Sequence, residues 1–149
     1  MYLFFDIDGV LNKESMWRIN YSLDREMVNR FCDFCHKLRA LPILMSSWRT
    51  GFIGVLSDEN SEPIRRLESL MLENDLKISG KTDVLKGRMR ETEIERYRIL
   101  HDEKREYLIL DDDPGEYGVI DANTYFTDSK IGLSDTDVKK ILKMYKDSF

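Results

Sequence analysis

The chain has 149 residues, with 28 acidic against 23 basic side chains and a formal net charge of −5 at pH 7. This length fits one domain with its own core, and 42% hydrophobic residues exclude a disordered or collagen-like chain. The acidic balance excludes a whole-surface electrostatic attachment to nucleic acid or anionic membranes, although a local basic patch stays open.

The first half of the chain alternates apolar runs with helical patterns. Residues 2–6 form an apolar run that ends in a carboxylate, which is typical of a buried strand. Apolar positions between 23 and 39 follow helical spacing, and Ser22 is the expected N-cap. Residues 41–45 form a second apolar run, which two serines end, and another amphipathic helix begins near Pro63.

The second half continues the alternation. A charged helix is expected over residues 91–101, an apolar run over 107–110 ends in three aspartates, a weaker strand lies near 125–127, and Ser134 opens a last helix. Strands that alternate with helices favour a parallel sheet covered on both faces. We expect one domain over residues 1–149, an α/β, Rossmann-like three-layer sandwich with a mostly parallel sheet of about five strands.

The two cysteines bear on the compartment of the protein and on a candidate haem site. Two cysteines, no signal peptide and an N-terminal apolar run too short to span a bilayer favour a cytoplasmic protein with no membrane association. Cys32, Cys35 and His36 match the Cys-x-x-Cys-His pattern for covalent haem. Because they lie inside an expected amphipathic helix, we interpret both cysteines as core residues and expect no haem, with a redox dithiol as the alternative.

Three of the expected strands end in polar pairs, at the edge where parallel sheets bind ligands. The pairs are Asp6 with Asp8, Ser46 with Ser47, and Asp111 with Asp112. Carboxylates ~4 Å apart repel by about 4 kcal/mol at an effective dielectric constant near 20. An Mg²⁺ ion relieves this repulsion and suits a phosphate substrate. The alternative is that these aspartates only cap the loops that follow.

Three motifs in the same order carry a resemblance to a known family. FFDIDGVLN (residues 4–12), ILMSSWR (43–49) and YLILDDD (107–113) resemble motifs of the haloacid dehalogenase-like (HAD) superfamily. The Ser-Ser-Trp-Arg form, with RETEI (90–94) and TDSKIGLS (127–134), is similar to the HAD domain of Swiss Army Knife RNA repair proteins. The resemblance spans nearly the whole chain.

The resemblance implies roles for the residues of the first strand end. Asp6 would be the nucleophile that takes the phosphoryl group, and Asp8 the general acid that protonates the leaving oxygen and then activates water. Gly9 would adopt a positive φ that lets backbone amides approach the phosphate.

It also implies a set of ligands for phosphate and metal. Ser46 would bind a phosphoryl oxygen, with Ser47 as the alternative. Asp111 would complete the Mg²⁺ site with Asp6 and the backbone carbonyl of Asp8, and Asp112 would be a further ligand or would orient one.

The superfamily also requires a cation beside the phosphate, and the residues do not single one out. Arg90 matches the related branch, and Lys86 is the alternative. Trp48 and Arg49 are candidate substrate contacts, although Trp48 would equally well pack over its loop. The segment where the superfamily inserts a small flap contains three further candidates, which would line the substrate entrance or only cover the edge of the sheet: Trp17, Arg18 and Tyr21.

The function that follows from the resemblance is a Mg²⁺-dependent phosphomonoester hydrolase with an aspartyl-phosphate intermediate. A minimal or absent cap and the related branch favour nucleic-acid terminal phosphates or nucleotides as substrates. The alternatives are a generic small-molecule or phosphoprotein phosphatase, and a non-catalytic, metal-binding interaction module. The sequence yields no expectation for the oligomeric state.

Overall fold

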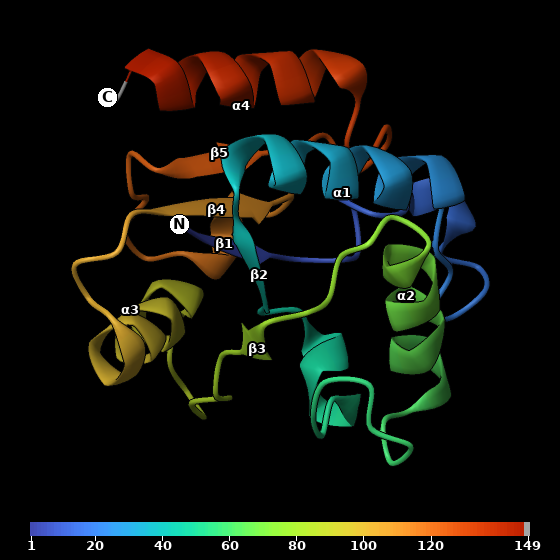
Figure 1. Cartoon of the computed structure of the whole chain (residues 1–149). Helices are drawn as coiled ribbons and strands as arrows, with labels where there is room; N and C mark the ends of the chain where they lie inside the picture. Colours follow the sequence, from blue (N-terminus) through green and yellow to red (C-terminus); the bar gives the residue numbers. More distant parts are fainter. Residues whose placement is uncertain (148–149) are drawn as a thin grey trace.

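The described residues centre on a sheet of five parallel strands in the order β3-β2-β1-β4-β5 (Figure 1). The computed structural model describes the backbone of residues 1–147 and the side chains of residues 1–145. The strands are β1 (Tyr2–Phe5), β2 (Leu41–Leu44), β3 (Gly80–Lys81), β4 (Tyr107–Asp111) and β5 (Thr124–Phe126).

Four helices and three short 3-10 segments connect or follow these strands in the described chain. They are α1 (Arg25–Leu38), α2 (Glu62–Leu72), α3 (Arg90–His101), α4 (Asp135–Asp147), η1 (Glu14–Met16), η2 (Ser47–Gly51) and η3 (Pro114–Glu116). The hydroxyl of Ser61 accepts from the N–H of Ile64 at the start of α2. The Ser134 hydroxyl accepts from the N–H of Asp137, so Ser134 opens the last helix as predicted.

Each face of the sheet has its own buried core. Leu3 and Phe5 pack with side chains of α1, α2 and α4, whereas Tyr2 and Phe4 pack on the other face with Ile94 and its neighbours on α3. Successive side chains of a strand point to opposite faces, so a strand covered on both sides must be apolar throughout. The predicted α/β, Rossmann-like three-layer fold is confirmed.

The strand register brings three strand ends to one edge. Phe5 of β1 lies opposite Leu44 of β2 on one side and Leu110 of β4 on the other. The chain runs outward through β2 and β3 in one direction and then through β4 and β5 in the other, so β1 and β4 flank a switch in direction. Such a switch point is where open α/β sheets bind ligands. Asp6 and Asp111 lie on either side of it.

The expected N-cap of the first long helix was wrong by two residues. The carboxylate of Asp24, and not the hydroxyl of Ser22, accepts from the N–H of Met27. Ser22 instead donates to the carbonyl of Ile19, inside the loop that precedes α1. Aspartate and serine are equally good N-caps, so the residue types alone do not show at which of the two positions the helix begins.

The short strand β3 has no counterpart among the individually predicted elements. It contains only Gly80 and Lys81, which pair with Ile43 and Leu44 of β2. A two-residue strand with a glycine and a lysine carries no apolar run, so the neighbouring strand defines it rather than its own sequence.

The two cysteines are core residues, as predicted. Cys32 and Cys35 are free and fully buried on the inner side of α1. Burial raises the pKa of the Cys32 thiol to about 12, which keeps it protonated. His36 is exposed, and its ring Nε2 lies 2.7 Å from the carbonyl of Asn74.

The connections around the sheet contain few elements in the described chain. In the described chain, the segment between β1 and α1 contains only η1, and the segment between β2 and β3 contains η2 and α2. Neither forms a separate lid domain. Across residues 1–147 no helix combines the length and the apolar character that crossing a bilayer requires.

Candidate active site

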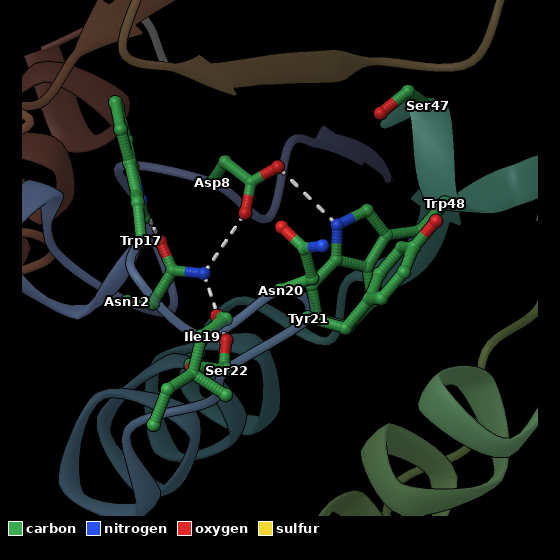
Figure 2. Close-up of a pocket in the computed structure, with 9 residues that line it drawn as sticks. All are labelled: Asp8, Asn12, Trp17, Ile19, Asn20, Tyr21, Ser22, Ser47 and Trp48. Atoms are coloured by element: carbon green, nitrogen blue, oxygen red, sulfur yellow. Dashed lines mark hydrogen bonds between the residues drawn. The ribbon is translucent and has the colours of Figure 1, made fainter.

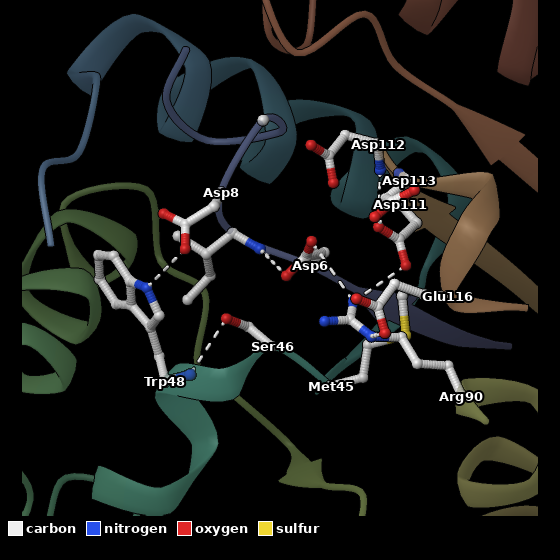
Figure 3. Close-up of polar contacts among 12 residues, drawn as sticks. Asp6, Asp8, Met45, Ser46, Trp48, Arg90, Asp111, Asp112, Asp113 and Glu116 are labelled. Carbon is white, nitrogen blue, oxygen red and sulfur yellow. Dashed lines mark hydrogen bonds and ion pairs between the residues drawn. The ribbon is translucent and has the colours of Figure 1, made fainter. Parts of the chain in front are cut away.

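Three aspartates meet at the carboxyl edge of the sheet, between β1 and β4 (Figure 3). One carboxylate oxygen each of Asp6, Asp111 and Asp112 lies within 4.8 Å of the other two. Asp6 directly follows β1 and Asp111 ends β4; both are buried, whereas Asp112 is half-buried. The parallel register thus unites carboxylates from opposite ends of the sequence, as their positions after the strands indicated.

Burial makes negative charge in this cluster costly. It raises the pKa of Asp6 well above its ordinary value; the Arg90 guanidinium opposes the rise and the Asp111 carboxylate adds to it. Burial also raises the pKa of Asp112 to about 7, with Asp111 contributing in the same direction. A cluster with these properties gains stability from any cation that binds among its oxygens.

Arg90 is the basic residue that the structure places at the cluster. It is the first residue of α3, and its Nη1 lies 2.9 Å from Oδ2 of Asp111 and 3.4 Å from Oδ2 of Asp6. Its Nε lies 3.9 Å from Glu116 at the rim. Arg90 therefore lies between two buried carboxylates, and its charge offsets theirs.

Asp111 is held more firmly than the other two aspartates. Its Oδ1 accepts from the N–H groups of Asp112 (2.7 Å) and Asp113 (3.3 Å). Its Oδ2 accepts from Arg90 and from the hydroxyl of Tyr117, at 2.7 Å. Sequence reasoning missed Tyr117, because nothing in its loop sets it apart from an ordinary surface tyrosine.

The oxygen-only donor set of the cluster fits a hard cation. Three carboxylates with no thiolate or imidazole among them favour Mg²⁺ over zinc. The raised pKa values of Asp6 and Asp112 agree, because a bound divalent ion would favour their ionised forms. These three carboxylates could hold Mg²⁺, the ion that the sequence resemblance implied.

Asp8 points away from the three-aspartate cluster. Its Oδ1 accepts from Nδ2 of Asn12 (2.9 Å), and its Oδ2 accepts from the indole N–H of Trp48 (3.2 Å). The metal contact that the resemblance implied for Asp8 is through its backbone carbonyl, so this direction of the side chain does not contradict it. The side chain of Asp6 therefore belongs to the carboxylate cluster, whereas that of Asp8 points to the opposite side of the loop.

Asn12 is a second residue that sequence reasoning missed. It is almost fully buried, and its Oδ1 accepts from the N–H of Gly9 (2.8 Å) and the indole N–H of Trp17 (2.9 Å). Its Nδ2 donates to Asp8 and to the carbonyl of Ser22. A signal for it existed, because Asp8 and Asn12 are four residues apart, the spacing that brings side chains together on a helical turn.

Gly9 has the positive φ that its position predicted, at +81°. A Cβ here would lie 2.2 Å from Oδ2 of Asp112, so only glycine leaves room for that carboxylate. The amide of Gly9 is already bonded to Asn12, and its carbonyl accepts from the hydroxyl of Thr127 (2.7 Å). In the described structure, Gly9 thus joins the loop after β1 to the segment after β5.

The two serines after β2 have different environments. Ser46 is fully buried, and its hydroxyl accepts from the N–H of Trp48 (3.2 Å) at the start of η2. In Figure 3 Ser46 lies between Trp48 and Asp6. Ser47 is exposed and faces the pocket beside Asp8. The structure favours Ser46 as the residue nearer the cluster.

Two expected contacts lie elsewhere. Arg49, a candidate substrate contact, is instead buried in an ion pair with Glu93, with its Nη2 2.9 Å and 2.8 Å from the two carboxylate oxygens. It also bonds the carbonyl of Met45, so its donors serve the fold and this expectation needs correction. Lys86 is exposed on the loop before α3, and none of the ion pairs between described residues includes it.

A parallel sheet of this order, with an Asp-x-Asp pair after β1 and an Asp-Asp pair at the end of β4, is typical of hydrolases of the HAD type. The chain belongs to the family described as the HAD domain in Swiss Army Knife RNA repair proteins, whose model matches residues 2–138. This confirms the resemblance that the motifs indicated. Searches of curated proteins and of solved structures find no match.

Proposed function

We propose that the protein is a Mg²⁺-dependent phosphomonoester hydrolase that works through an aspartyl-phosphate on Asp6. The observation that carries this proposal is that the two aspartates after β1 have separate environments. Asp6 is buried in the carboxylate cluster beside Arg90, and Asp8 is held separately by Trp48 and Asn12. Hydrolysis through a covalent intermediate needs both a nucleophile and a distinct acid–base group.

The two halves of the reaction use these residues in turn. An oxygen of Asp6 attacks phosphorus, the bond between phosphorus and the leaving oxygen breaks, and Asp8 gives its proton to that oxygen. Asp8 then takes a proton from a water molecule while the water oxygen attacks phosphorus. The bond between phosphorus and Asp6 breaks, inorganic phosphate leaves, and Asp8 is protonated again.

Arg90 and Ser46 are the groups we assign to the phosphoryl oxygens. Arg90 carries a positive charge 3.4 Å from Asp6, so a phosphoryl group on Asp6 would lie within its reach. Ser46 is buried two residues beyond Leu44, the last residue of the neighbouring strand β2, at the same edge. Both groups would stabilise negative charge that develops during transfer.

The carboxylates of Asp6, Asp111 and Asp112, with the backbone carbonyl of Asp8, are the groups we assign to Mg²⁺. When bound, the ion neutralises charge on the phosphate and on the carboxylates around it. Asp111, which four donors already fix, would position the other two ligands.

We further infer that the substrate is a nucleic-acid terminal phosphate or a nucleotide. The family description names RNA repair proteins, and the described chain has no separate lid domain that would restrict the size of the substrate. The net charge of −5 favours a short substrate over extended nucleic acid. Free, buried cysteines suit a reducing compartment, so we place the protein in the cytoplasm.

The decisive test is Asp6→Asn assayed with p-nitrophenyl phosphate and Mg²⁺. We expect wild-type turnover that EDTA abolishes, and a loss of about 1,000-fold or more in Asp6→Asn, because an amide is not a nucleophile of this kind. Asp113→Asn is the matched control: Asp113 is exposed, and an asparagine can still cap η3.

Two outcomes contradict the proposal in different ways. Retained activity in Asp6→Asn would show that another residue is the nucleophile. A wild-type protein that binds Mg²⁺ but turns over neither aryl phosphates nor nucleotides would be a non-catalytic, metal-binding module.

A further inference from the structure

A pocket of about 440 Å³ opens on the side of the site to which Asp8 points (Figure 2). It lies between the loop that precedes α1 and the start of η2. Three aromatic side chains form its walls: Trp17 and Tyr21 come from the loop, and Trp48 comes from η2. Its volume falls within the range of sites for small organic ligands.

The aromatic walls are held in place although two of them face solvent. Trp17 is 41% exposed and Tyr21 is 50% exposed, whereas Trp48 is 4% exposed. Hydrogen bonds fix both indoles, that of Trp17 to Asn12 and that of Trp48 to Asp8. The ring of Tyr21 packs edge-on against Trp48, with centroids 5.1 Å apart.

The backbone at Tyr21 is unusual. Its φ is +62°, in the left-handed region that bulky residues avoid. Such a conformation costs free energy and persists where the surroundings impose it, often at ligand sites. Here it belongs to the residue whose half-exposed ring lines the pocket.

The charge of the pocket limits which ligands it can bind. None of its nine described lining residues is a lysine or an arginine, and its one charged group is the carboxylate of Asp8. A second phosphate would meet no basic partner here. Amide and hydroxyl groups of Asn20, Ser22 and Ser47 also line it, so polar atoms on a neutral ring would find hydrogen-bond partners.

We propose that this pocket is the leaving-group subsite and that it binds the nucleobase of a nucleoside phosphomonoester. The proposal rests on the proposed function, because Asp8 lies on the pocket wall and the general acid must adjoin the leaving oxygen. Aromatic rings around a pocket whose described lining residues include no basic side chain suit stacking on a planar, uncharged base. The same base can belong to a mononucleotide or to the terminal nucleotide of an oligonucleotide.

The test compares substrates that differ in the base. We expect kcat/KM for adenosine monophosphates, assayed as both the 3′ and the 5′ isomer, to exceed that for ribose 5-phosphate. Stacking on one aromatic side chain corresponds to about 5- to 100-fold. A phosphate-terminated oligoadenylate distinguishes the two sources: equal kcat/KM with the mononucleotide means that the end of a chain is accepted, and a much lower value means that free nucleotides are the substrate.

Variants of Trp17 tie this preference to the pocket. Trp17→Ala should lower the ratio of adenosine monophosphate to ribose 5-phosphate turnover by about 5- to 100-fold, and Trp17→Phe should keep most of it because a ring remains. Tyr21→Ala should act in the same direction. Ile99→Ala, at an exposed position on α3 outside the pocket, is the control and should leave the ratio unchanged.

Quenching of tryptophan fluorescence by adenosine separates this proposal from the proposed function. If neither phosphate is hydrolysed but adenosine still binds in a manner that Trp17→Ala weakens, the pocket assignment stands and the phosphatase assignment fails. Equal turnover of both substrates by the wild type, or an unchanged ratio in both Trp17→Ala and Tyr21→Ala, would overturn the base subsite and leave the phosphatase intact.

Discussion

The carboxylate of Asp8 is held by donors from two separate segments, Asn12 in its own loop and Trp48 after β2. An acid–base group works only if its carboxyl lies in reach of the reacting oxygen, so fixing its rotamer matters as much as its presence. Neither donor reaches the proposed nucleophile Asp6 in the described contacts, which makes both of them positioning residues for Asp8.

Trp48→Phe tests this positioning role. The phenyl ring keeps one aromatic ring in place and removes the indole N–H donor together with the second ring. We expect kcat/KM for glycerol phosphate, which reports phosphoryl transfer to Asp6, to fall by about tenfold or more. The kcat/KM for p-nitrophenyl phosphate should fall less, because nitrophenolate leaves without a proton. Steady-state kinetics on the two substrates check this. An equal loss on both would reduce Trp48 to a structural role.

Gly9→Ala probes the close approach of the first loop to Asp112. The new methyl group would meet Oδ2 of Asp112 at 2.2 Å, in addition to the strain of a positive φ. We expect a loss of about 2–3 kcal/mol in the free energy of unfolding, together with weaker Mg²⁺ binding. Urea denaturation and Mg²⁺ titration measure the two effects.

Gly87→Ala is the matched control for this change. Gly87 has a similar φ of +75°, but a Cβ there would meet nothing within 4 Å. It should lose only about 1–2 kcal/mol through the backbone strain. If the two alanine variants were equally stable and bound Mg²⁺ equally well, the proposed crowding at Asp112 would be wrong.

At the scale of elements, the ion pair between Arg49 and Glu93 joins η2 to α3. These two segments carry Trp48 and Arg90, which reach the site from opposite sides. Both charges are buried, and the Glu93 carboxylate also accepts from the N–H of Leu85 (2.8 Å). A buried pair with such additional hydrogen bonds fixes the relative placement of the elements it joins.

Glu93→Gln measures how strongly this pair supports the fold. The amide keeps the size and one acceptor but leaves Arg49 as an uncompensated buried charge, so we expect a loss of about 3 kcal/mol in the free energy of unfolding. Asp33→Asn is the comparison, since the pair of Asp33 with Lys37 is exposed and its loss should cost less than about 1 kcal/mol. Equal losses in urea denaturation would contradict the structural role.

At the scale of the whole molecule, the fold buries three carboxylates close together, and this links the site to the stability of the fold. The carboxylates of Asp6, Asp111 and Asp112 converge because β1 and β4 are neighbours in the sheet, although the chain forms two other strands and three helices between them. The same burial that brings them together raises the pKa values of Asp6 and Asp112. Stability should therefore depend on pH and on Mg²⁺ together.

The direction of this dependence follows from Asp112. Its pKa is 3.8 when unperturbed and about 7 in the folded chain, so the folded state holds the proton more tightly. This contribution to stability is fully present below pH 3.8 and is lost as the pH rises through about 7. Asp6 shifts in the same direction.

In EDTA, we expect Tm to fall between ~pH 5 and ~pH 8 by more in the wild type than in Asp112→Asn, which has no carboxyl to titrate at that position. Mg²⁺ should raise the wild-type Tm most at the higher pH, with about 2.7 kcal/mol of added stability at a concentration 100 times its Kd. Differential scanning calorimetry measures both effects. A pH profile identical in the two proteins would contradict the assigned titration.

The sequence by itself determined the strands β1, β2 and β4 and the residues at their ends. A strand buried on both faces must be a continuous apolar run, and the polar residue that stops the run is visible in the sequence. Since parallel strands present their carboxyl ends at one edge, the meeting of Asp6 with Asp111 followed from pattern and fold class alone.

Only the tertiary structure decided which side chains surround those carboxylates. Arg90 rather than Lys86 contacts the cluster, because the first residue of α3 lies next to Asp111 at the end of β4. In the described structure Arg49 does not contact the cluster, because it forms an ion pair with Glu93 of α3. Tyr117 and Asn12 gain their roles from the same kind of contact. Side-chain partners depend on where elements pack in space, whereas local periodicity records only which face of an element is buried.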